Sequence, residues 1–184
     1  MNLKKIVVIG PESTGKSWLC EKLAAQYNSN WVKEFAREYL LINGKDYTLN
    51  DLDLIAKGQI GNENKIANQI MDCLETFDAR KPLFIDTDLY VMKVWSEFVF
   101  NQCSFEILNG IINHNYDLYL LCKPDIPWVS DELREYPDLL TREKLFHHYK
   151  DIMINQSVPW IEINGHFENR FQMAIQAVDQ LLQK

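Results

Sequence analysis

The sequence lacks long apolar runs, is poor in glycine and has no excess of basic residues. Its 184 residues include 7 glycines and 6 prolines, with 19 Lys and Arg against 26 Asp and Glu. A membrane-spanning helix needs about 18 or more apolar residues, so we expect no membrane association. The net charge of -7 argues against binding of a nucleic-acid backbone, which needs clustered basic side chains. The apolar run 6–9 is too short for a signal peptide, so we expect a cytoplasmic protein.

Cysteine usage gives no sign of a metal site or of a redox pair. The four cysteines, Cys20, Cys73, Cys103 and Cys122, are scattered, and no C-x-x-C pair is present. Their apolar surroundings predict reduced core residues. The composition, with 47% hydrophobic and 24% charged residues, is typical of a globular protein. The length predicts one domain over residues 1–184.

Short apolar runs alternate with segments of helical periodicity along the chain. The predicted strands are 5–9, 30–33, 83–85, 117–122 and 160–163. The predicted helices are 16–27, 35–42, 49–77, 90–100, 105–112 and 167–182, and Gly58 and Gly61 are candidate kinks in the third. This order predicts the α/β class, with a five-stranded parallel sheet and helices on both faces. The segment 124–142 contains three prolines and interrupts the alternation of strands and helices. We interpret it as a lid, with an ordinary connection as the alternative.

One motif determines the class of protein. Residues 10–17 read Gly-Pro-Glu-Ser-Thr-Gly-Lys-Ser and match G-x-x-x-x-G-K-[ST] between a predicted strand and a predicted helix. Such a loop points its backbone N–H groups at phosphate oxygens, Lys16 reaches the β- and γ-phosphates, and Ser17 is a ligand of Mg²⁺. The alternative is a glycine turn that binds nothing. The predicted nucleotide-binding residues are Gly10, Glu12, Ser13, Thr14, Gly15, Lys16, Ser17 and Trp18.

Further motifs separate a kinase from a GTPase or a motor. The D-x-x-G and N-K-x-D motifs of GTPases are absent, and the chain is short for a motor. Asp86 and Asp88 follow the predicted strand 83–85, at the sheet edge where α/β proteins bind ligands. Asp86 is a candidate for holding Mg²⁺ or for accepting the proton of the acceptor hydroxyl. Asp88 faces the same side if the strand continues, which makes it a candidate substrate ligand. Helix N-capping is the alternative for both residues.

Charged and aromatic residues follow the predicted strand 30–33. Glu34 and Arg37 share one face at helical spacing and are candidate acceptor-site residues, with Glu34 a candidate general base. A solvated charged face is the alternative. Among the aromatic residues near these motifs, Tyr39 and Trp128 neighbour polar residues, so we favour them as faces for a cationic acceptor ring.

With these residues in view, the chain resembles the ribosylnicotinamide kinase domain of the NadR-type NAD-biosynthesis proteins, a P-loop family. The resemblance rests on the blocks 10–17, 34–39 (Glu-Phe-Ala-Arg-Glu-Tyr), 55–59, 86–88, 93–97, 116–121, 124–128 (Pro-Asp-Ile-Pro-Trp) and 131–134. It implies phosphorylation of nicotinamide riboside by ATP to give nicotinamide mononucleotide. Larger members also carry a helix-turn-helix and an adenylyltransferase domain, neither of which we find, so we expect no DNA-binding role.

The mechanism expected from the motif and the resemblance is direct γ-phosphoryl transfer to a ribose 5′-hydroxyl. Ser17 and Asp86 place Mg²⁺, and either Glu34 or Asp86 takes the proton. Arg134 and Arg142 close over the phosphates from the lid and exclude water. The alternatives are another nucleoside or deoxynucleoside kinase, or a regulatory ATP-binding module without turnover. The expected partner is a small-molecule substrate, and the sequence leaves a homo-oligomer open.

Overall fold

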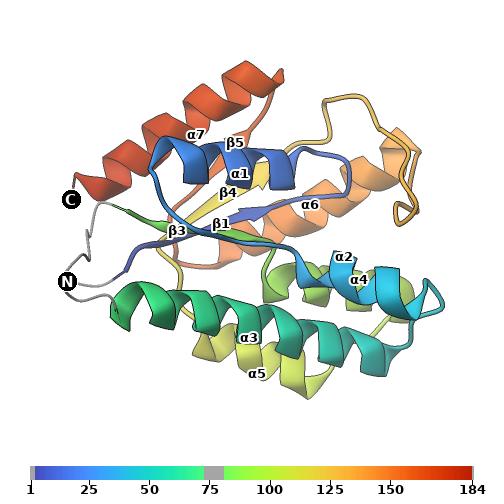
Figure 1. Cartoon of the computed structure of the whole chain (residues 1–184). Coiled ribbons are helices and arrows are strands. Elements are labelled where there is room, and N and C mark those ends of the chain that lie inside the picture. The colour runs from blue at the N-terminus through green and yellow to red at the C-terminus, as the bar shows by residue number, and fades with distance from the viewer. Residues whose placement is uncertain (1–2, 73–80, 184) are drawn as a thin grey trace.

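Five parallel strands form the centre of the computed structural model, which describes residues 3–72 and 81–183 (Figure 1). The strands are β1 (Lys5–Ile9), β2 (Trp31–Val32), β3 (Leu83–Asp86), β4 (Leu118–Cys122) and β5 (Trp160–Ile163). Their order across the sheet is β2-β3-β1-β4-β5, and every neighbouring pair is parallel. The predicted five-stranded parallel sheet is therefore confirmed.

Helices cover both faces of the sheet. Figure 1 shows α1 (Lys16–Gln26) and α7 (Phe167–Leu182) on one face. On the other side lie α2 (Phe35–Asn43), α3 (Leu49–Asp72), α4 (Leu89–Phe100), α5 (Phe105–Asn113) and α6 (Leu139–Asn155). Alternate side chains of β1 point to opposite faces: Ile6 packs in the core under α1 and α7, and Val7 packs in the core of the other side.

The structure differs from the predicted elements in two informative places. The second strand has two residues, because only Trp31 and Val32 pair with β3. Helix α3 runs without a break past Gly58 and Gly61. A Cβ atom at Gly58 would lie 2.1 Å from the Phe35 ring, so this glycine permits close packing of α2 on α3. The predicted end of this helix, residues 73–77, lies outside the described residues.

The structure describes three of the four cysteines. Cys20, Cys103 and Cys122 are free thiols, and the first and last of these are buried. Cys73 lies outside the described residues. Across residues 3–72 and 81–183, no helix combines the length and the apolar character that a membrane span requires.

The strand order determines where a ligand can bind. The chain leaves β1 toward β2 and β3 on one side, then crosses over β1 to β4 on the other side. In open parallel sheets, ligands bind beyond the carboxyl ends of the strands at such a point of reversal. The loop 10–15 follows β1 at that point.

Candidate active site

The loop after β1 has the backbone conformation of a phosphate-binding loop. Gly10 and Gly15 have φ values of 139° and 78°, which favour glycine, and Ser13 is left-handed at 54°. A Cβ atom at Gly10 would lie 2.5 Å from the carbonyl oxygen of Cys122, so only glycine fits where the loop passes the end of β4. Lys16 begins α1, and its Nζ donates to the Pro11 carbonyl at 2.9 Å.

A cavity of about 550 Å³ opens beside this loop. Residues 10–18 of the loop and of the start of α1 form one end of it. The remaining wall includes a group of apolar and aromatic side chains from α2, α4 and α6, namely Ala36, Leu40, Val91, Trp95, Phe98, Leu145 and Tyr149. The charged side chains Glu34, Arg37 and Arg134 also line the cavity. A phosphate-binding end and an apolar wall therefore share one space.

Asp86 lies next to the phosphate-binding loop and is 1% exposed. Its Oδ1 atom has no hydrogen-bond partner among the described residues. Burial and the neighbouring Glu34 carboxylate raise the pKa of Asp86 to about 7, whereas the Lys16 charge and the nearby Ser17 hydroxyl act to lower it. A cation bound here would relieve both the burial penalty and the repulsion.

Oxygen donors are the ligands that Mg²⁺ prefers, and Asp86 and Ser17 supply a carboxylate and a hydroxyl side by side. Within the described parts of the chain, no group of three or more His, Cys, Asp and Glu side chains is arranged to hold a metal ion. Mg²⁺ is usually held by one or two protein oxygens together with substrate phosphates.

Asp88 does not line this cavity, and β3 ends at Asp86, so the strand does not continue to Asp88 as its prediction assumed. Thr87 is left-handed, with a φ of 70°, and turns the chain after β3. Asp88 caps α4 by accepting from the Tyr90 N–H at 3.0 Å, and it also accepts from the Tyr119 hydroxyl at 2.7 Å. The helix-capping alternative therefore describes Asp88.

The two aromatic residues favoured from sequence also lie outside the cavity lining. The Tyr39 hydroxyl donates to Asp51 at 2.6 Å, and its ring centroid lies 6.3 Å from that of Phe35. Trp128 Nε1 donates to Glu12 at 3.0 Å. Both hydrogen-bond partners lie far along the chain, 12 residues from Tyr39 and 116 residues from Trp128. Trp95, Phe98 and Tyr149 provide the aromatic wall instead.

Residues 123–138, here called the connecting segment, join β4 to α6 and are fastened to the phosphate-binding loop. The Glu12 carboxylate accepts from the backbone N–H groups of Glu135 and Tyr136 at 2.9 and 2.8 Å, in addition to Trp128. The Ser13 hydroxyl accepts from the Val129 N–H at 2.9 Å. The side chains of Glu12 and Ser13 thus hold the connecting segment.

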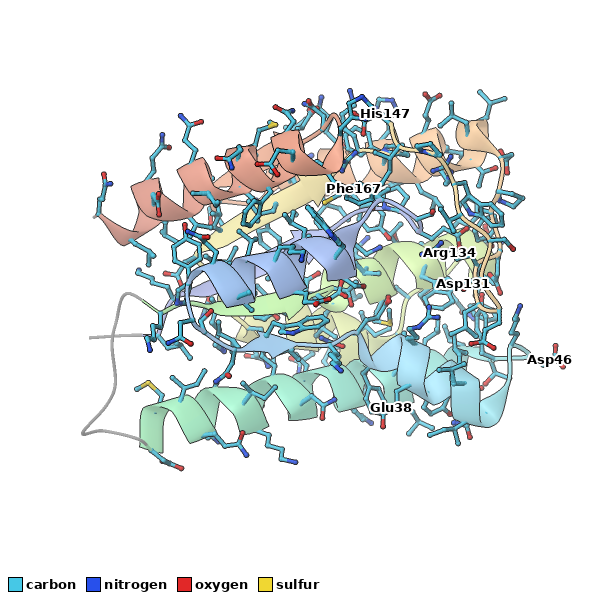
Figure 2. The ribbon with its side chains drawn as sticks, turned by 45° about the horizontal axis from the view of Figure 1, so that its top comes forward. Glu38, Asp46, Asp131, Arg134, His147 and Phe167 are labelled. Atoms are coloured by element: carbon cyan, nitrogen blue, oxygen red, sulfur yellow. The ribbon has the colours of Figure 1, made fainter. Side chains whose placement is uncertain are left out.

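The candidate lid arginines occupy different elements. Arg134 lies on the connecting segment, where its Nε is 3.3 Å from an Asp131 oxygen that also contacts Arg37 at 3.0 Å (Figure 2). Arg142 lies in the first turn of α6, because that helix begins at Leu139. It is 4% exposed, and its Nε and Nη1 atoms have no partner among the described residues. Arg142 does not line the cavity.

Arg170 is a feature that the sequence analysis missed. This α7 residue is 1% exposed and donates to backbone carbonyls at the ends of three strands and to the Asp125 carboxylate. A signal was available in the sequence. Arg170 occupies the same helical stripe as Ala174 and Val178, both fully buried. A charged residue on a buried stripe needs partners.

The loop at the reversal point of a parallel sheet and the cavity beside it define a P-loop protein with a kinase-like fold. The chain belongs to the AAA domain family, whose model matches residues 5–170. It is 24% identical to the trifunctional NAD biosynthesis/regulator proteins NadR of Escherichia coli strain K12 and of Salmonella typhimurium strain LT2. Each of these matches covers 98% of this chain and 43% of the relative, so the chain spans less than half their length.

Solved structures share the fold. A NadR protein in complex with NR gives a TM-score of 0.80 at 22% identity, over 99% of this chain and 52% of that one. A NadR protein with NAD and AMP-PNP gives 0.71 at 21% identity, over 99% and 50%. Deoxyadenosine kinase from M. mycoides gives 0.56 at 14% identity, over 96% and 99%. The resemblance inferred from the sequence blocks is thus confirmed.

Proposed function

We propose that this protein is an ATP-dependent nucleoside kinase that transfers the γ-phosphoryl group to the 5′-hydroxyl of nicotinamide riboside. One observation carries the proposal: a single cavity is lined by the phosphate-binding loop, by an apolar and aromatic wall and by Glu34. Such a cavity suits a triphosphate at one end and a flat ring at the other. The similarity to NadR proteins, one of them in complex with NR, supports the choice of acceptor.

The phosphate-binding loop provides most of the binding of ATP. Its backbone N–H groups and the start of α1 attract the phosphates, and Lys16 exchanges the Pro11 carbonyl for a phosphate oxygen. Ser17 and Asp86 would hold Mg²⁺, which supplies neutralisation of charge on the β- and γ-phosphates when bound. The orphaned Oδ1 of Asp86 is the observation that favours this assignment.

The two candidate bases, Glu34 and Asp86, differ in their position relative to the cavity. Glu34 lines the cavity and is half-buried, whereas Asp86 is buried and does not line it. We therefore assign Glu34 to orienting the acceptor hydroxyl and accepting its proton, and Asp86 to the metal side. The group transferred is the γ-phosphoryl: its bond to the β-γ bridging oxygen breaks, its bond to the 5′-oxygen forms, and the hydroxyl proton passes to Glu34.

We assign Arg134 and Arg142 to offsetting the negative charge of the phosphates. Arg134 lines the cavity from the connecting segment, and Arg142 brings two unpartnered guanidinium nitrogens to the start of α6. In this proposal, Arg134 approaches the phosphates from the connecting segment and Arg142 approaches them from the first turn of α6, which also excludes water. Arg37 serves the acceptor side, where it lines the cavity and pairs with Asp131.

A second acceptor class has an observation in its favour. The deoxyadenosine kinase of M. mycoides shares the fold across 96% of this chain, so other nucleosides are the competing acceptors. The test is ADP release with Mg-ATP and a panel of nucleosides, with Lys16→Ala as the control for contaminating kinases. The proposal expects the highest kcat/KM with nicotinamide riboside. If only a purine or pyrimidine nucleoside is phosphorylated, that nucleoside replaces nicotinamide riboside as the assigned acceptor. If no acceptor causes ADP release, the kinase assignment fails and an ATP-binding module without turnover is the function that remains.

A further inference from the structure

We propose that Arg170 is a positioning residue, which holds the backbone of the phosphate-binding loop in its phosphate-accepting orientation and ties that loop to the root of the connecting segment. The inference rests on the proposed function only in requiring that a nucleotide binds at this loop. It concerns a residue of α7 that lies outside the P-loop motif.

All five N–H bonds of the Arg170 guanidinium have an acceptor. Nε donates to the Gly165 carbonyl at 2.7 Å. Nη1 donates to the carbonyls of Thr14 and Ile163 at 3.2 and 3.4 Å. Nη2 donates to the Lys123 carbonyl at 3.0 Å and to the Asp125 carboxylate. A buried arginine with all its donors satisfied has one well-defined geometry, since the guanidinium is a rigid fork.

These acceptors join segments that are far apart in the sequence. Thr14 belongs to the loop after β1, Lys123 follows β4, and Ile163 ends β5. The three strands are neighbours in the sheet, in the order β1-β4-β5. Arg170 therefore links the loop after β1 to the carboxyl ends of β4 and β5.

The contact with Thr14 has a direct consequence for phosphate binding. In a trans peptide, the carbonyl of one residue and the N–H of the next point in opposite directions. When the Thr14 carbonyl is held toward Arg170, the Gly15 N–H must point away from α7. Gly15 itself lines the cavity, and it precedes the first residue of α1. Arg170 thus determines the direction of an N–H group in the loop that binds phosphate.

The contact with Asp125 extends this order to the connecting segment. The Asp125 Oδ1 atom accepts from Arg170, and its Oδ2 atom accepts from the Gly165 N–H at 2.8 Å. The root of the connecting segment is thereby fixed to the loop between β5 and α7. The Arg170–Asp125 contact is an ion pair, so the same bond that fixes the segment also balances the buried guanidinium charge.

The experiment compares Arg170→Lys with Val178→Ala, a control on the buried stripe of the same helix that does not touch the loop. The Kd of AMP-PNP with Mg²⁺ is measured well below the unfolding temperature of each variant, with folding checked by circular dichroism. Lysine keeps the charge but loses the fork, so we expect about ten-fold weaker binding, the size of one hydrogen bond to an ionised group. Val178→Ala keeps the wild-type Kd.

A second measurement separates positioning from general destabilisation. In acceptor-dependent turnover, Arg170→Lys raises KM for ATP and leaves KM for the acceptor unchanged. In two-dimensional NMR of the protein labelled on its backbone amides, it also abolishes the shift of the Gly15 amide on adding AMP-PNP. If Arg170→Lys does not fold, Asp125→Asn decides, with a smaller increase in Kd expected. If a folded Arg170→Lys variant binds AMP-PNP with the wild-type Kd, the inference about Arg170 is overturned. If the wild-type protein does not bind AMP-PNP at all, the proposed function is overturned instead.

Discussion

The Glu12 carboxylate holds the connecting segment against the phosphate-binding loop, so its removal should release that segment. Its Oε1 accepts from Trp128 Nε1 at 3.0 Å and from the Tyr136 N–H at 2.8 Å, and its Oε2 accepts from the Glu135 N–H at 2.9 Å. Glu12→Ala removes all three hydrogen bonds. Glu12→Gln keeps one oxygen that can accept two of them, and it places an amide donor where the Glu135 N–H was accepted.

The number of hydrogen bonds gives the expected magnitude. A hydrogen bond to an ionised group contributes about 1.5 to 3 kcal/mol when buried, and nearer 1 kcal/mol where water competes, as it does at this half-exposed side chain. Glu12→Ala should therefore lower the free energy of opening the connecting segment by about 2 to 4 kcal/mol, and Glu12→Gln by about 1 kcal/mol. The fold should persist, because these bonds join a loop to a surface segment.

Hydrogen exchange of the Glu135 and Tyr136 amides measures this directly, since both amides donate to Glu12. Each 1.4 kcal/mol lost from the opening free energy accelerates exchange about ten-fold. Glu38→Ala is the matched control, because Glu38 is an exposed acid on α2 (Figure 2). Equal protection of these two amides in Glu12→Ala and in the wild type would refute the assignment of Glu12 as the fastener of this segment.

Two further predictions concern the proposed reaction. Lys16→Ala should lose nearly all turnover while its circular dichroism stays close to wild type, because Lys16 donates one hydrogen bond, to the Pro11 carbonyl of its own loop, among the described residues; unchanged kcat would remove the kinase assignment. For the acceptor, replacing nicotinamide riboside by its reduced, uncharged form should lower kcat/KM more in the wild type than in Trp95→Leu, since Trp95 lines the cavity. Tyr39→Leu is the control outside the lining, and equal kcat/KM for both acceptor forms in the wild type would show that the cation is not recognised.

The parts of the site that sequence reasoning predicted are those encoded locally. The P-loop and the helix after it occupy consecutive residues, and the motif itself specifies where Lys16 and Ser17 lie. The position of Asp86 followed from the apolar strand before it, since the sheet edge collects such residues. Strand and helix alternation predicted the layers because each buried strand is a continuous apolar run.

The parts that escaped prediction depend on distant residues or on one backbone dihedral angle. The left-handed Thr87 moves Asp88 out of register, and the sequence pattern carries no signal for that φ value. The apolar wall combines α2, α4 and α6, whose residues look like ordinary core positions until packing brings them to one cavity. Trp128 was assigned to the acceptor because it has polar neighbours, whereas the structure shows its hydrogen bond to Glu12 across 116 residues.

Asp86 and Asp88 offer a paired test of the metal-side assignment, because burial raises the pKa of each to about 7. A carboxyl with a raised pKa binds its proton more tightly in the folded chain than in the unfolded chain. The free energy of unfolding should therefore fall as the pH rises from about 4 to about 7, and each of Asp86→Asn and Asp88→Asn should flatten part of that fall.

Asp86→Asn and Asp88→Asn should change the pH dependence of stability in the same way, but nucleotide binding should distinguish them. Only Asp86 lies beside Lys16 and Ser17, whereas the Asp88 oxygens accept from the Tyr90 N–H and the Tyr119 hydroxyl. If the ionised Asp86 holds the cation that accompanies ATP, the Kd of AMP-PNP with Mg²⁺ should tighten as the pH rises through 7 in the wild type and in Asp88→Asn. Asp86→Asn should bind the nucleotide more weakly and lose that pH dependence. Isothermal titration calorimetry between about pH 5.5 and 8.5, a range that spans the raised pKa of about 7, measures the Kd of all three proteins. The same pH dependence in Asp86→Asn as in the wild type would assign the metal-side role to another group, because an amide has no proton to release in this range.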